Sequence, residues 1–78
     1  MKSPITIDPD IQFGTPVFTG TRVPVESLFW HLESGISLDT FLEEFPSVTR
    51  EQAVAVLDMA AKAFSSDKLL SLIYEIAD

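Results

Sequence analysis

The residues best suited to chemistry in this chain are two neighbouring aspartates, a lone histidine and two arginines. Asp8 and Asp10 are close enough in sequence to resemble a carboxylate pair. No nucleophile, glycine-rich phosphate loop or second acidic cluster accompanies them, and Asp-Pro-Asp is ordinary turn chemistry. His31 stands alone, which is more typical of a solvated or interface residue than of a metal ligand or base. We therefore expect no catalytic residue, metal site or cofactor, and we predict a binding protein rather than an enzyme.

The cationic side chains are better candidates for binding. Arg22 presents forked donors that suit a phosphate or a partner's carboxylate. We favour the simpler explanation that it braces the N-terminal segment against acids such as Asp8 or Glu26, because it lies in a structural turn. Thr49, Arg50 and Gln52 are candidates for DNA binding, because a helix N-terminus suits phosphate while arginine and glutamine read base edges. A helix cap also accounts for Thr49 and Gln52, so only Arg50 has no structural explanation in the sequence.

Composition limits the classes of function. The chain has 78 residues, 46% of them apolar, and no cysteine, so it forms one small core without disulfides. Because so small a core is only marginally stable, we expect self-association to stabilise the fold. Twelve acidic residues against five basic ones give a net charge of −7, which repels nucleic acid and favours either a basic protein partner or a role of the charge in solubility. No apolar run approaches the length of a membrane span and no leader pattern is present, so we expect a cytoplasmic protein.

The elements that must position these residues begin with an arm of strands and turns over residues 1–23. Ile5-Thr6-Ile7 and Val17-Phe18-Thr19 alternate as short strands do, and aspartate, proline and glycine separate them. The next segment, 24–64, contains three apolar stripes at helical spacing, with Pro24, Ser37 and a Thr49–Gln52 capping box at the helix starts. The stripes comprise Val25, Leu28, Phe29 and Leu32; Leu38, Phe41, Leu42 and Phe45; and Ala53, Leu57, Ala60 and Phe64.

A fourth helix is predicted over 66–78, after the break at Ser65-Ser66-Asp67. Its apolar face is wider than one stripe and needs a cover, so we predict partner contacts at Leu69, Leu70, Ile73 and Ile76. Folding back on the chain's own core, or packing across a twofold axis in a homodimer, are the other covers that the sequence leaves open.

The predicted fold is a single, mainly α domain, a three-helix bundle with a short N-terminal β arm and a C-terminal helix. The second and third helices are separated by Pro46-Ser47-Val48, which allows a helix-turn-helix, although plain three-helix bundles share this spacing. Trp30 lies off the main stripe of the first helix, where it is either a core lid or an interface anchor.

Several short motifs, in their order and spacing, resemble the family called domain of unknown function 433. They extend from Ile5 to about Ala61 and comprise Ile7-Asp8-Pro9, Gly14-Thr15-Pro16-Val17, Gly20-Thr21-Arg22-Val23-Pro24-Val25, Gly35-Ile36-Ser37 and Phe45-Pro46. The chain departs from the family pattern at Phe13-Gly14-Thr15-Pro16, where relatives commonly have a Gly-Gly-Lys-Pro type of turn.

The resemblance implies a homeodomain-like helical fold and the antitoxin half of a type II toxin-antitoxin pair. On this hypothesis the chain neutralises a nuclease-like toxin by direct binding and binds operator DNA, with the toxin and the DNA as its partners and no membrane involved. The alternative is a homodimeric protein-interaction module that does not bind DNA. Both hypotheses predict a homodimer, because strand edges and the apolar tail exceed what so small a domain covers alone.

Overall fold

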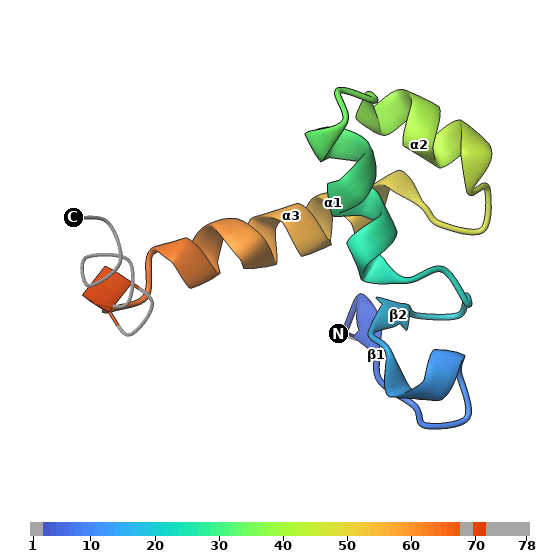
Figure 1. Cartoon of the computed structure of the whole chain (residues 1–78), viewed down its shortest axis with the longest axis horizontal. Helices are drawn as coiled ribbons and strands as arrows, with labels where there is room; N and C mark the ends of the chain where they lie inside the picture. The colour runs from blue at the N-terminus through green and yellow to red at the C-terminus, as the bar shows by residue number, and fades with distance from the viewer. Residues whose placement is uncertain (1–2, 68–69, 72–78) are drawn as a thin grey trace.

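A computed structural model describes residues 3–67 and 70–71 of the chain. Along the sequence it contains strand β1, a short 3-10 turn η1 (Gln12–Gly14), strand β2 and three helices, α1 to α3. Figure 1 shows the two strands at one end, α1 and α2 stacked beside them, and α3 passing behind α1 and continuing away from the other elements. The mainly helical fold with a short β arm is therefore confirmed.

The arm is a two-stranded antiparallel sheet. β1 (Ile5–Thr6) pairs with β2 (Val17–Phe18), with Ile5 opposite Phe18 and Thr6 opposite Val17. Side chains extend the pairing beyond the backbone, because the hydroxyls of Thr6 and Thr19 lie 2.9 Å apart and Thr19 donates to the Ser3 carbonyl at 2.8 Å. A bridge between Val17 and Pro24 then joins the arm to the start of the first helix.

Helices α1 (Val25–Glu33) and α2 (Leu38–Glu44) begin at the residues that the sequence predicts. Pro24 precedes α1, where its fixed φ suits entry into a helix. Gly35, at a φ of 82° that side chains with a Cβ rarely adopt, turns the chain after α1. Ser37 caps α2 by accepting a hydrogen bond from the Thr40 amide at 3.1 Å.

The core lies where β2, α1, α2 and the first half of α3 meet. Phe18 of β2, Leu28 of α1 and Phe41 of α2 are completely buried, and the rings of Phe18 and Phe41 are 6.2 Å apart. The other buried members are Val25, Val48, Ala53 and Val56. Val48 was predicted only as part of a linker, but the turn after Pro46 directs it inward, and its amide donates to the Phe45 carbonyl at 3.0 Å.

Helix α3 (Arg50–Phe64) is the longest element, and only its first half is packed. Ala53 and Val56 are buried, and Leu57 and Ala60 are half-buried on the same side. Every residue from 61 to 67 is exposed. The predicted apolar face is therefore confirmed only in part, because the buried Val56 was not in the predicted stripe and Leu57, at its centre, is only half-buried. The face also continues past the end of the core, so that Phe64 is 60% exposed.

Candidate functional site

The N-terminus of α3 carries the capping box that the sequence predicts. The Thr49 hydroxyl accepts from the Gln52 amide at 3.1 Å, and the Gln52 side-chain oxygen accepts from the Thr49 amide at 3.0 Å. The side-chain nitrogen of Gln52 donates to the Thr19 carbonyl at 2.8 Å, a bond that the sequence analysis did not predict. Both polar atoms of this amide are thus occupied within the chain, and base reading by Gln52 would require breaking one of these bonds.

Arg50, which the sequence left without a structural role, forms an ion pair with Asp39 at the start of α2. Both side chains are more than half exposed, so water screens the pair and its contribution to stability is small. The pair connects the two helices of the predicted helix-turn-helix. It also places a carboxylate beside the cation that was the best candidate for phosphate contact.

Arg22 is exposed and has no hydrogen bond or ion pair within the described part of the chain. The bracing contacts with acids such as Asp8 or Glu26 are therefore not observed. Instead, the neighbouring Thr21 holds the turn, since its hydroxyl donates to the Phe18 carbonyl at 2.8 Å and accepts from the Val23 amide at 3.0 Å. This turn follows Thr19, the residue bonded to Gln52, so Arg22 lies on the loop tethered to the start of α3.

An open hollow runs along the exposed side of α3. Arg50, Glu51, Val54, Ala55 and Asp58 line it, so its charged lining has two carboxylates and one guanidinium. The next cation on the helix, Lys62, is paired with Asp58 at 3.0 Å. A surface with more negative than positive side chains disfavours binding of a nucleic-acid phosphate backbone.

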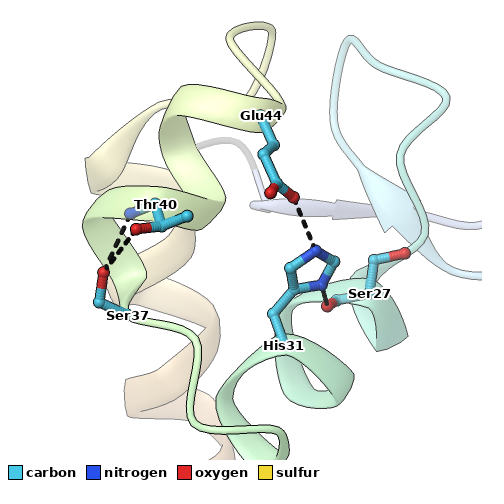
Figure 2. A network of polar contacts seen from close by, with 5 residues as sticks. All are labelled: Ser27, His31, Ser37, Thr40 and Glu44. Carbon is cyan, nitrogen blue, oxygen red and sulfur yellow. Dashed lines mark hydrogen bonds and ion pairs between the residues drawn. The ribbon is translucent and has the colours of Figure 1, made fainter.

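His31 has a structural role, which corrects its interpretation as a solvated or interface residue. Its Nδ1 lies 2.6 Å from the Ser27 carbonyl and its Nε2 lies 3.0 Å from Glu44 of α2 (Figure 2). The ring also contacts Phe41 and Phe45 edge-on. The α1 stripe alone could not predict this role, because it does not show that α2 covers the adjacent side of the helix.

Of the four predicted partner contacts in the tail, only Leu70 belongs to the described residues. It is half-buried, and its amide donates to the Ser66 carbonyl at 3.0 Å. Leu69, Ile73 and Ile76 lie outside the described residues, as does most of the helix predicted over 66–78.

Large apolar side chains are exposed at several described positions. Trp30 is 56% exposed, so it is not a core lid. On α3, Met59 and Phe64 are 45% and 60% exposed. Phe13, at the tip of the arm, is completely exposed. Among the described residues there is neither a helix long and apolar enough to cross a membrane nor a cluster of three potential metal ligands.

Comparison with known proteins supports the resemblance seen in the motifs. Residues 5–60 match the family described as "Protein of unknown function (DUF433)". The chain belongs to this family. The match includes the arm, α1, α2 and most of α3, and therefore every candidate DNA-binding residue.

Among curated proteins, the DUF433 chain is similar to "Uncharacterized protein y4eO" of Sinorhizobium fredii (strain NBRC 101917 / NGR234). The two are 44% identical over 48 residues, which cover 62% of this chain and 22% of the relative. The chain thus spans about a fifth of the length of that relative. No solved structure matches this chain, so the homeodomain-like description is not confirmed by a structural neighbour.

Proposed function

We propose that this DUF433 chain is a protein-binding module of the antitoxin type, which neutralises a nuclease-like toxin by direct contact. The observation that carries the proposal is the second half of α3. Leu57, Ala60 and Phe64 follow the spacing i, i+3, i+7 on the side that packs on the core, yet Phe64 lies beyond the core and is exposed. An apolar helix face of this spacing is the type that partner proteins bind in a groove.

Charge supports a protein partner. The chain carries a net charge of −7, and proteins that act on nucleic acids are commonly basic where they contact phosphate. An acidic chain therefore attracts a basic nuclease at long range and accelerates their encounter. The apolar face of α3 would then supply the short-range contacts, and the predicted tail contacts would extend it.

Operator binding is a second candidate, supported by the arrangement of α2 and α3. The two helices are joined by a five-residue segment, 45–49, and Arg50 is the first residue of α3. Arg22, which has no partner among the described residues, follows the loop that Gln52 bonds through the Thr19 carbonyl. The acidic lining of the hollow on α3 weighs against it. For this reason we rank protein binding first.

The test uses the purified product of the reading frame adjacent to this gene. We expect the full chain to form a complex with it at micromolar concentration and to suppress its nuclease activity on RNA. Absence of a complex would contradict the proposal.

Titration of duplex DNA from upstream of the gene tests operator binding. If Arg50 contacts phosphate, Arg50→Ala should reduce the salt dependence of the DNA affinity by about one phosphate contact. No DNA binding by the unaltered chain at low salt would remove the second candidate.

A further inference from the structure

The turn between the two strands of the arm has an unusual backbone. Gln12, Phe13 and Gly14 have successive positive φ values of 50°, 57° and 84°. Glycine adopts this region of backbone conformation freely. For other residues the conformation is energetically unfavourable, because Cβ lies close to the following carbonyl oxygen. Such outliers persist only where the surrounding structure holds them, and they are concentrated at functional sites.

The turn is held by a series of backbone hydrogen bonds. The Ile11 amide donates to the Asp8 carbonyl at 2.9 Å, the Gly14 amide to Ile11 at 3.1 Å, and the Thr15 amide to Gln12 at 3.1 Å. Because these bonds overlap along residues 8–15, they fix the direction in which the Phe13 side chain leaves the backbone. The turn therefore fixes the direction of the Cα–Cβ bond that carries this ring.

The Phe13 side chain gains nothing within the described chain that offsets its backbone strain. It is 100% exposed, whereas Phe18, five residues later, is completely buried. Glycine at position 13 would remove both the strain and the exposed apolar surface. An aromatic ring in a preorganised turn has the properties of an interface anchor, since aromatic anchors dominate binding and preorganisation lowers the entropy lost on association.

The surroundings of the ring indicate the chemistry of its partner. Asp8 and Asp10 lie on the same turn, and residues 3–21 contain no basic side chain. Asp10 is exposed, and its amide donates to the Asp8 carboxylate at 2.9 Å. Carboxylates beside an apolar anchor match an apolar pocket with lysine or arginine at its rim, and they repel both nucleic acid and a second copy of this acidic chain.

We infer that the 8–15 turn is a protein-binding site, in which Phe13 enters an apolar pocket of a basic partner and Asp8 and Asp10 face cations at the rim of that pocket. This inference rests on the proposed function, because it adds a second contact with the same partner. Figure 1 shows the turn, in blue, at the end of the molecule away from the projecting half of α3. A partner that contacts both would bind two separate regions of the chain.

The test measures the affinity of the full chain for the adjacent gene's product, with Phe13→Gly as the main variant. We expect Phe13→Gly to weaken binding at least about tenfold, as the loss of an aromatic anchor does. Asp10→Asn should weaken it less and reduce its dependence on salt. Ile7→Thr is the matched control, because Ile7 is also exposed on the arm, and we expect it to change the affinity less than about twofold.

Stability separates a docking role from a structural one. Because the Phe13 ring is fully exposed and its backbone is strained, Phe13→Gly should unfold at the same urea concentration as the unaltered chain or at a higher one. A less stable variant would show that the ring packs on its own chain, and would overturn the inference.

Four further results would also overturn it. Equal affinity of Phe13→Gly and the unaltered chain would contradict the binding site at the 8–15 turn and leave the proposed function intact. No binding by the unaltered chain would contradict both. If Phe13→Gly abolished self-association in sedimentation experiments without changing partner affinity, the ring would belong to an interface between copies. If it abolished binding to phosphatidylcholine vesicles instead, the ring would be a lipid anchor.

Discussion

At the scale of single residues, polar side chains of this protein join elements that lie far apart in the sequence. Gln52 caps α3 and, through its side-chain nitrogen, holds the Thr19 carbonyl of the arm. His31 joins the Ser27 carbonyl of its own helix to Glu44 of α2. In a domain with so small a core, the loss of a single bond of this kind is a large fraction of the total stability.

Substitution of Gln52 tests whether its two bonds act separately. Gln52→Ala removes both and should lower the free energy of unfolding by about 1–3 kcal/mol, from a lost cap and a lost tether. Gln52→Glu keeps the acceptor for the Thr49 amide but places a carboxylate against the Thr19 carbonyl. Its free energy of unfolding should therefore lie between those of Gln52→Ala and the unaltered chain. Urea unfolding followed by circular dichroism measures both. A loss below about 0.5 kcal/mol for Gln52→Ala would mean that neither bond stabilises the fold in solution.

At the scale of elements, α3 has two parts with different roles. Its first half completes the core through Ala53 and Val56, while its second half extends the same apolar face into solvent and ends at the exposed Phe64. The 15 residues of the helix span about 22 Å, which is longer than the part of the core that they cover. The helix thus joins the folded domain to the surface that we propose for the partner.

Two truncations on α3 separate packing from binding. Val56→Ala should lower the free energy of unfolding by about 1.5–3 kcal/mol, because its side chain is buried. Phe64→Ala should change stability by less than about 0.5 kcal/mol but weaken the complex with the proposed toxin partner about tenfold. Urea unfolding and calorimetric titration provide the two measurements. If Phe64→Ala destabilised the chain as much as Val56→Ala, Phe64 would be covered in solution and the face would not be free for a partner.

Local patterns predicted the starts of the helices well, because Pro24, Ser37 and the Thr49–Gln52 box act within one turn of each start. They did not predict contacts made across the fold. The bond from Gln52 to Thr19 spans 33 residues, and no periodicity in either segment indicates it. The backbone at Gln12 and Phe13 was also not predicted, since non-glycine residues with positive φ have no sequence signature of their own.

At the scale of the whole molecule, net charge distinguishes the proposed partners. Twelve acidic side chains against five basic ones repel DNA and a second copy of the chain, and attract a basic protein. The homodimer remains a prediction, based on the strand edges and the apolar tail of so small a domain, and the uncovered face of α3 adds a further surface for it. If the homodimer and the toxin complex both use that face, they compete for it.

The two assemblies should therefore respond to salt in opposite directions. Between 50 and about 500 mM NaCl the screening length falls severalfold, so the toxin complex should weaken as attraction is lost, while the homodimer should strengthen as repulsion is lost. Sedimentation equilibrium of the chain alone, at micromolar concentration, measures the homodimer, and calorimetric titration measures the complex. A chain that stays monomeric at every salt concentration would remove the homodimer prediction. A complex whose affinity is independent of salt would show that apolar contacts alone select the partner, so that the net charge has another cause, such as solubility.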